Sequence, residues 1–238
     1  MSDDGTVLFA RYAYPPNELG YCGPDGADAL LRAGETAEIA RRARRFEGAW
    51  AYLEFIARAA GIADPLDVRV VQAYWVGNDL LDAVRGEELV GWLRERFVGQ
   101  LGGTWQDAGA RALPHHSFQV YEVYPWAELL RRHGHPQAMS VLDRCRIRTG
   151  TVLSVGPGTA VVRSRPLVWT GHTLAEGEPA DETVRWAADG RSLLDGLSAG
   201  DRVTLHWDWV CDVVTDEQSA LADRLDASRG RSPVRPRR

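Results

Sequence analysis

The hydrophobic pattern changes its period once along the chain. In the first part, apolar residues recur every three to four positions, for example at Ile39, Ala43 and Phe46, which is the spacing of one buried helix face. In the second part, short alternating runs are separated by connections rich in Gly and Pro, as expected of strands. The pattern therefore predicts an α+β protein, with a mainly α-helical domain at residues 1–143 and a small antiparallel β-barrel domain at residues 144–228.

Two segments of the first part lack the helical pattern. Residues 1–23 are rich in aromatic residues, Pro and Gly, which predicts an ordered but irregular segment. Residues 118–124 alternate between two sets of side chains, which predicts a short extended piece before a helix that begins near Pro125. Elsewhere the start and stop signals are helical, and Asp64 followed by a proline predicts a helix start.

The second part contains four β-rich runs and a closing helix. The runs occupy residues 145–155, 159–169, 182–188 and 201–214. The GPG sequence at residues 156–158 predicts a hairpin turn between the first two runs. Thr215 is a typical helix cap, with Glu217 in the following turn, so a C-terminal helix is expected after the last strand. The last ten residues hold five Arg and two Pro, which predicts a disordered tail at 229–238.

Composition narrows the class of protein. The chain has 238 residues, of which 45% are apolar, and a formal net charge of −5, so a sizeable core is expected. An acidic balance gives no reason to expect nucleic-acid binding. The sequence contains no apolar run long enough to span a bilayer, and its first residues do not resemble a secretory signal. We therefore expect a cytoplasmic protein with neither nucleic-acid nor membrane partners.

Cysteine chemistry, if present, is that of single thiols. The three cysteines, Cys22, Cys145 and Cys211, are widely separated and form no CxxC pair, so neither a disulfide framework nor a zinc knuckle is expected. Cys22 lies on a tight turn flanked by glycines, which allows an exposed and reactive thiol, and the sequence leaves the reactivity of this thiol open. Strand alternation predicts that Cys211 faces inward.

Residues 144–228 resemble a known family. Cys145, Gly150 and Val152 have the spacing C-x4-G-x-V, and a later Gly-Asp pair is followed by a hydrophobic strand containing His206 and by an acidic helix start. In this order and spacing the motifs resemble the HypC/HupF family of hydrogenase maturation chaperones. The resemblance implies an OB-like barrel with a C-terminal helix. In that family the barrel carries the iron of the nickel-iron site, with its cyanide and carbon monoxide ligands, and docks on a HypD scaffold and on the immature large subunit.

The resemblance also assigns candidate metal ligands. Cys145 takes the place of the family's metal-binding cysteine, and His206 takes that of its strand histidine. A thiolate suits low-spin iron and an imidazole is a reasonable second donor. The adjacent Arg144, Arg146 and Arg148 are expected to lower the pKa of the thiol. The secondary candidates are Cys22, His115 and His116, and because neighbouring residues of an extended chain face opposite sides, the two histidines are not expected to share a metal.

The function predicted from these features is that of an accessory chaperone or metallocentre carrier without turnover of its own. The sequence contains no G-x-S-x-G, P-loop, G-x-G-x-x-G or H-E-x-x-H motif, so the usual carriers of hydrolase and nucleotide chemistry are missing. The expected cofactor is iron in an iron-cyanide/carbonyl group, and the expected partners are a HypD-like scaffold or a hydrogenase large subunit. Two alternatives stay open: a cysteine-dependent enzyme with its site on the helical domain, and a metal-free protein-interaction module.

Overall fold

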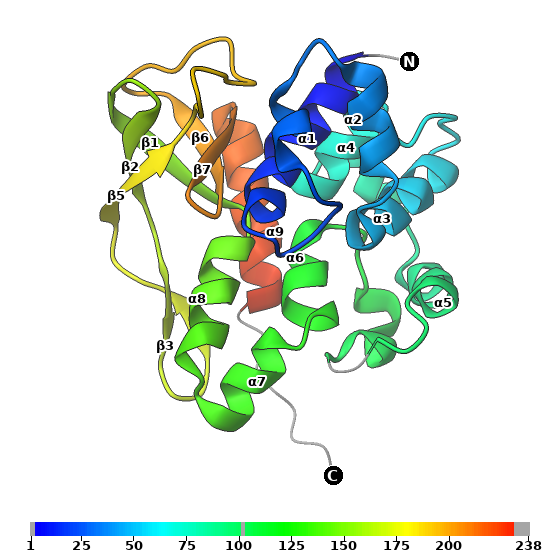
Figure 1. Ribbon diagram of the computed structural model, residues 1–238. Helices are drawn as coiled ribbons and strands as arrows, with labels where there is room; N and C mark the ends of the chain where they lie inside the picture. Colours follow the sequence, from blue (N-terminus) through cyan, green and yellow to red (C-terminus); the bar gives the residue numbers. More distant parts are fainter. Residues whose placement is uncertain (1–2, 101–102, 231–238) are drawn as a thin grey trace.

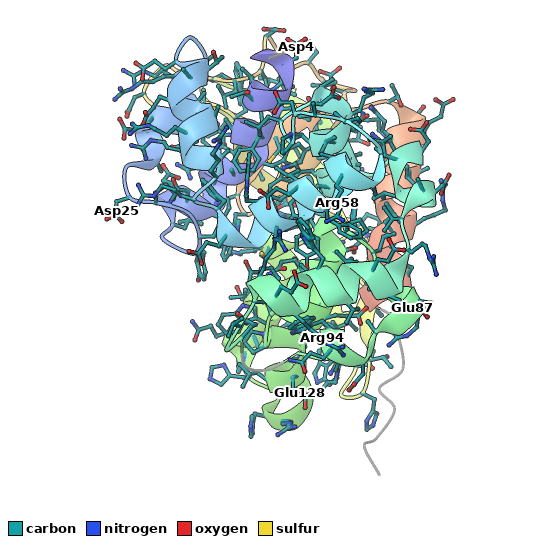
Figure 2. All side chains as sticks on the ribbon, turned by 90° about the vertical axis from the view of Figure 1, so that its right-hand side faces the viewer. Asp4, Asp25, Arg58, Glu87, Arg94 and Glu128 are labelled. Carbon is teal, nitrogen blue, oxygen red and sulfur yellow. The ribbon has the colours of Figure 1, made fainter. Side chains whose placement is uncertain are left out.

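Most helices lie on one side of the molecule and the larger β-sheet lies on the other (Figure 1). The computed structural model describes residues 3–100 and 103–230. Charged side chains of the helices, including Arg58, Glu87 and Arg94, are exposed on the outer surface (Figure 2). None of the helices in the described ranges has the length and apolar character needed to cross a bilayer. The α-helices are α1 (Asp3–Glu18), α2 (Thr36–Ala43), α3 (Glu47–Ala59), α4 (Val68–Trp75), α5 (Gly86–Arg96), α6 (His116–Phe118), α7 (Trp126–His133), α8 (Pro136–Cys145) and α9 (Asp216–Gly230).

The N-terminal segment is a helix, so the prediction of an irregular segment was wrong. α1 packs against α4 and contacts strands of the sheet. Its buried residues Phe9, Tyr12 and Ala13 recur at helical spacing, and this burial stabilises a helix that composition alone does not favour. Pro15 and Pro16 lie inside its last turn, where each removes one backbone N–H from the helical hydrogen bonds.

The predicted extended piece at residues 118–124 is also helical. α6 runs directly into a π-helical turn, η5 (Gln119–Val123), and residues 114–123 are all buried. Alternation predicts a strand only when one face meets solvent, and a segment enclosed on all sides carries no such signal. Short π-helical turns are rare and are found mostly at functional sites.

The larger sheet has five strands in the order β1-β2-β5-β7-β6, and β6 pairs with β1. The pairings are antiparallel except that of β5 with β7, which share one residue pair, Arg185 and Trp209. A second sheet contains β3 and β4. The strands are β1 (Arg148–Val155), β2 (Thr159–Ser164), β3 (Leu167–Trp169), β4 (Leu174–Glu176), β5 (Ala180–Arg185), β6 (Arg202–His206) and β7 (Trp209–Val213). The α+β class, the hairpin turn at residues 156–158 and the C-terminal helix were predicted correctly.

Element ends differ from the prediction in three places. Cys145 is the last residue of α8, and β1 begins at Arg148, so the cysteine ends a helix and does not start a strand. Asp67 caps α4 by accepting a hydrogen bond from the backbone N–H of Arg69, whereas Asp64 was expected. α9 extends to residue 230, which places Arg229 in a helix, and the rest of the predicted tail, residues 231–238, lies outside the described residues.

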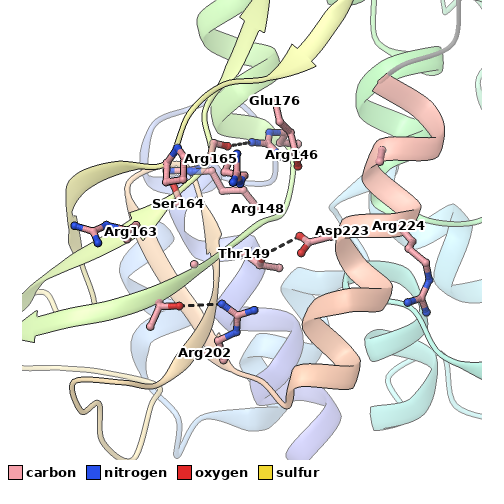
Figure 3. A pocket seen from close by; sticks show the side chains of 14 residues that line it. Arg146, Arg148, Thr149, Arg163, Ser164, Arg165, Glu176, Arg202, Asp223 and Arg224 are labelled. Atoms are coloured by element: carbon pink, nitrogen blue, oxygen red, sulfur yellow. Dashed lines mark hydrogen bonds between the residues drawn. The ribbon is translucent and has the colours of Figure 1, made fainter.

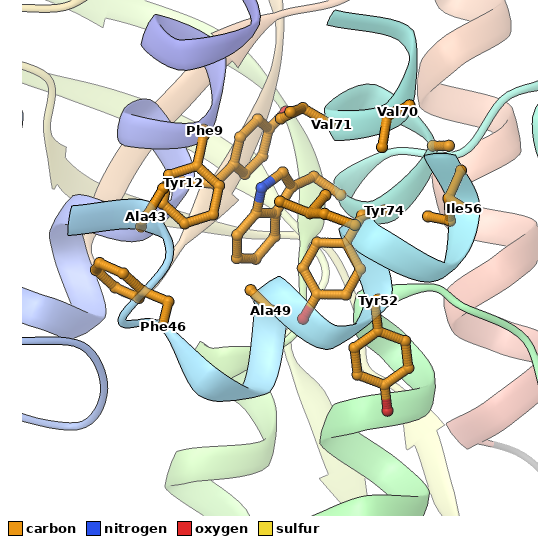
Figure 4. Close-up of a cluster of buried hydrophobic side chains, with 14 of the residues drawn as sticks. Phe9, Tyr12, Ala43, Phe46, Ala49, Tyr52, Ile56, Val70, Val71 and Tyr74 are labelled. Carbon is orange, nitrogen blue, oxygen red and sulfur yellow. The ribbon is translucent and has the colours of Figure 1, made fainter. Parts of the chain in front are cut away.

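The largest core cluster joins the helices to the sheet. Its centre is a set of aromatic and aliphatic side chains from α1, α3 and α4, including Phe9, Tyr12 and Tyr74 (Figure 4). The same cluster includes Trp209 and Cys211 of β7, so the prediction that Cys211 faces inward is confirmed. α1 also forms hydrogen bonds with the sheet: the Tyr12 and Thr204 hydroxyls are 2.8 Å apart, and Arg11 bonds Asp212 at 2.6 Å. The division into two domains stays a prediction.

Candidate metal centre

Three potential metal ligands from distant parts of the chain meet inside the protein. His116 begins α6, Cys145 ends α8 and His206 ends β6. Their ligand atoms all lie within 4.8 Å of one another, and all three residues are buried. In a tetrahedral site with metal bonds of about 2.0–2.3 Å, the donors are about 3.3–3.8 Å apart. The three donors therefore bind one ion when their separations shorten by up to about 1.5 Å.

The N-terminal helix fixes the orientation of His206. Pro16 lacks the N–H that would normally bond to the carbonyl of Tyr12 one turn earlier. That carbonyl instead accepts a hydrogen bond of 2.7 Å from Nδ1 of His206. Because Nδ1 carries the proton, Nε2 carries the lone pair of the imidazole. His206 is only 1% exposed, and its Nε2 has no hydrogen-bond partner among the described residues. Metal-binding histidines usually donate their other N–H to such an acceptor.

His116 is held by a carbonyl on one side and a hydroxyl on the other. Its Nε2 lies 2.7 Å from the carbonyl oxygen of Cys145, which only accepts, so Nε2 donates. Its Nδ1 lies 3.2 Å from the hydroxyl of Tyr74. With Nε2 protonated, Nδ1 carries the lone pair, and the hydroxyl of Tyr74 donates to it. A metal ion bound through Nδ1 would replace Tyr74 as the partner of that nitrogen, while Nε2 keeps its hydrogen bond to the carbonyl of Cys145.

Burial keeps all three donors neutral in the absence of metal. It lowers the pKa of His116 from 6.5 to about 4 and lowers the pKa of His206 well below its usual value. Both imidazoles are therefore uncharged at pH 7, the form that binds metals. Burial also raises the pKa of the Cys145 thiol well above its usual range. A metal ion bound here would displace the thiol proton.

The expectation that nearby arginines lower this pKa was wrong. Arg146 bonds to Asp226 at 3.0 Å, and Arg148 bonds to Glu182 at 2.7 Å, so each guanidinium is neutralised by its own carboxylate. Both side chains line a separate cavity of about 550 Å³ between β1, β2 and α9 (Figure 3). Arg146 and Arg148 therefore do not lower the pKa of the Cys145 thiol, and the loss of hydration on burial raises it.

A cavity of about 500 Å³ adjoins the three donors. Tyr21 and Trp207 form part of the cavity wall, and their stacked rings have centroids 4.1 Å apart. Tyr21 is 48% exposed. Cys22 also lines this cavity, although it does not belong to the three-donor group. Besides the donors, the cavity wall includes several aromatic side chains and two charged ones, Arg45 and Glu47. The aromatic side chains include Tyr74, Trp75, Tyr124, Trp126 and Trp207.

The structure thus brings Cys145 and His206 together with only one of the paired histidines. His115 accepts a hydrogen bond from the backbone N–H of Ser117 through Nδ1, burial lowers its pKa to about 3, and it is not part of the group. Sequence reasoning did not identify Tyr74 as a partner of His116, nor the Tyr12 carbonyl as the partner of His206. For the Tyr12 carbonyl, the signal in the sequence was the pair Pro15 and Pro16 at the end of α1. Each proline lacks an N–H and so leaves a carbonyl one turn earlier without its helical partner.

One family model matches the chain, over residues 1–230, so the chain belongs to the Family of unknown function (DUF6390). No curated protein and no solved structure matches it. The matched range includes both the helical part and the sheet. All three donors therefore lie within the region that defines the family.

Proposed function

We propose that this DUF6390 protein binds a transition-metal ion through His116, Cys145 and His206 and holds it without turnover of its own. The observation that carries the proposal is the convergence of three buried donors, one of which, Nε2 of His206, is unpartnered. A buried polar atom without a partner costs about 1–3 kcal/mol. A metal ion would offset this cost by bonding to that lone pair.

The donor set favours borderline and soft metals. One thiolate and two imidazoles suit Fe(II), Zn(II) or Co(II), whereas Mg²⁺ and Ca²⁺ prefer oxygen ligands. Three protein donors leave at least one coordination position open, as in sites where a metal also binds a small molecule. The aromatic cavity beside the donors provides room for such a ligand.

A more specific form of the proposal is accessory work in nickel-iron hydrogenase maturation. It is supported by the resemblance of residues 144–228 to HypC/HupF proteins, which includes Cys145 and His206. It is also supported by a strand order in which β6 returns to β1, followed by a C-terminal helix; we propose that these elements form an OB-like barrel. In this form the metal is iron in an iron-cyanide/carbonyl group, the partner is a HypD-like scaffold or the immature large subunit, and the location is cytoplasmic.

The state of the thiols favours a ligand over a nucleophile. Burial raises the pKa of Cys22 to about 12 and also raises that of Cys145. A catalytic cysteine needs the thiolate at neutral pH, which usually requires a lowered pKa. A metal ligand has no such requirement, because the ion itself displaces the proton.

Titration of the metal-free protein with Co(II) tests the proposal through the absorption bands of thiolate-bound cobalt. The wild type is expected to bind one ion, and Cys145→Ala and His206→Ala are expected to lose it. Cys211→Ala, which removes a buried thiol outside the cavity, is the matched control and should bind normally. Stoichiometric binding that survives Cys145→Ala would refute the proposal.

The hydrogenase form needs its own measurement. Protein purified from its native host should contain iron and show infrared bands of bound cyanide and carbon monoxide. Cys145→Ala should abolish both the bands and hydrogenase activity in that host. Normal hydrogenase activity in the mutant strain would reject this form while leaving the metal site intact.

A further inference from the structure

The Cys22 thiol shares a cavity with the three proposed metal ligands. Cys22 lies on the turn between α1 and the 3₁₀ helix η1 (Ala27–Leu31), far from Cys145 in sequence. Both cysteines line the cavity of about 500 Å³, together with His116 and His206. The two thiols are close enough that Cys22 contributes to raising the pKa of Cys145. Two thiols and two imidazoles therefore border one cavity.

Three consecutive residues of this turn are each anchored to a different neighbour. The Tyr21 ring stacks on Trp207, the residue that follows His206. The carbonyl of Cys22 accepts a hydrogen bond of 2.8 Å from the side-chain amide of Asn17. Gly23 has a φ of +83° and lies so close to Phe46 that a Cβ atom would overlap its ring. These contacts place Cys22 at the cavity wall.

We infer that Cys22 is the fourth protein ligand of the metal, completing a set of two imidazoles and two thiolates. This inference rests on the proposed metal site. Its independent support is the unpartnered Nε2 of His206, which belongs to a residue lining the same cavity. Cys22 is outside the group whose donors lie within 4.8 Å, so it reaches the ion by a shift of its turn. Gly20 precedes Tyr21 and Cys22 with a φ of +74° and has nothing within 4 Å of an added Cβ, so the backbone is free to rotate there.

The four-ligand site has distinct chemistry. Two thiolates and two imidazoles in a tetrahedral arrangement are typical of zinc and of iron bound to sulfur. Each thiol loses one proton when it binds, so a divalent ion binding two neutral thiols releases two protons, whereas the three-ligand site releases one. His116, Cys145 and His206 lie at the ends of regular elements, whereas Cys22 lies on a turn. Cys22 is therefore the ligand that can dissociate first and open a route for transfer of the metal.

Two measurements on the full chain count the sulfur ligands. X-ray absorption of the zinc-loaded wild type should show two sulfur neighbours at about 2.3 Å, and titration in weak buffer with a pH indicator should show two protons released per zinc. Cys22→Ser should reduce both counts to one and weaken zinc binding at least about tenfold. Cys211→Ser is the matched control and should give two in both measurements.

The outcomes separate this inference from the proposed function. One sulfur and one proton in the wild type, with no change in Cys22→Ser, would overturn the role of Cys22 and leave the three-ligand site standing. Binding that is unaffected by Cys145→Ala would overturn the site itself. If Cys22→Ser does not fold, alkylation of wild-type Cys22 by iodoacetamide provides the test: zinc should protect this thiol at least about tenfold, and equal labelling with and without zinc would contradict the inference.

Discussion

Asp226→Ala should destabilise the protein far more than the loss of an exposed ion pair. Asp226 projects from α9 and is buried against two other segments, accepting hydrogen bonds from Arg146 at 3.0 Å and from the Tyr121 hydroxyl at 3.3 Å. Arg146 is only 2% exposed. Burial raises the pKa of Asp226 despite the attraction of Arg146, so the loss of hydration outweighs that attraction.

The magnitude follows from what the mutation leaves behind. Removing one partner of a buried pair typically costs 3–5 kcal/mol, because the other charge is left without compensation. Asp143, whose carboxylate is 3.5 Å from Nε of Arg146, provides partial compensation, so we expect about 3 kcal/mol. The matched control is Asp181→Ala, which breaks an ion pair with Arg163. The side chain of Arg163 is 55% exposed and that of Asp181 is 46% exposed. Exposed pairs of this kind contribute little to stability, because water screens both charges.

Urea unfolding, followed by circular dichroism and tryptophan fluorescence, measures the free energies of unfolding of Asp226→Ala and of the control Asp181→Ala. The double variant Arg146→Met/Asp226→Leu replaces both charges by apolar groups and should recover most of the lost stability. The reasoning would be refuted if the free energy of unfolding of Asp226→Ala lay within about 1 kcal/mol of that of the control. It would also be refuted if the double variant were as unstable as Asp226→Ala.

Three further predictions concern acid stability, the metal site and the packing of α1. The buried His115 and His116 have pKa values lowered to about 3 and about 4, so the metal-free protein should lose roughly 2–3 kcal/mol per histidine between pH 7 and pH 4.5. Their stabilisation is complete above the unfolded pKa of 6.5 and declines below it; urea unfolding at the two pH values checks this, and equal stabilities would contradict it. Pro16→Ala supplies an N–H that competes with His206 for the Tyr12 carbonyl, so cobalt affinity, measured by chelator competition, should fall about tenfold; an unchanged affinity would exclude this role. In Gly5→Ala the added Cβ overlaps backbone atoms preceding α4, and thermal melts should show a loss of roughly 1–3 kcal/mol, whereas an unchanged melting temperature would refute the packing argument.

The parts of the fold that sequence predicts are those set by local patterns. The change from helical to alternating periodicity identified the α+β class, and Thr215 forms the expected cap, with its hydroxyl accepting from the N–H of Gln218. The failures were α1 and residues 118–124. In α1, aromatic and proline content obscured a helical spacing that only tertiary burial makes decisive. In residues 118–124, burial on every side removed the contrast on which the alternation rule depends.

The site was less predictable, because its contacts link residues with no sequence relationship. Cys145 and His206 were identified through the family resemblance and His116 as a secondary candidate, yet no pattern shows that the three meet. Tyr74 and the carbonyl of Tyr12 act through contacts that exist only in the folded chain. The arginines beside Cys145 misled for the same reason, since their charges are compensated by carboxylates remote in sequence.

The hydrogen bond from His206 to the Tyr12 carbonyl also has a consequence for the order of events in the cell. Tyr12 precedes His206 by 194 residues in the chain, so it leaves the ribosome first. A nascent chain that ends before β6 contains Cys22, His116 and Cys145 but neither the third donor nor the strand that aligns with α1. Metal loading at the complete site therefore follows the synthesis of β6, and a chain terminated before β6 lacks His206 as a ligand.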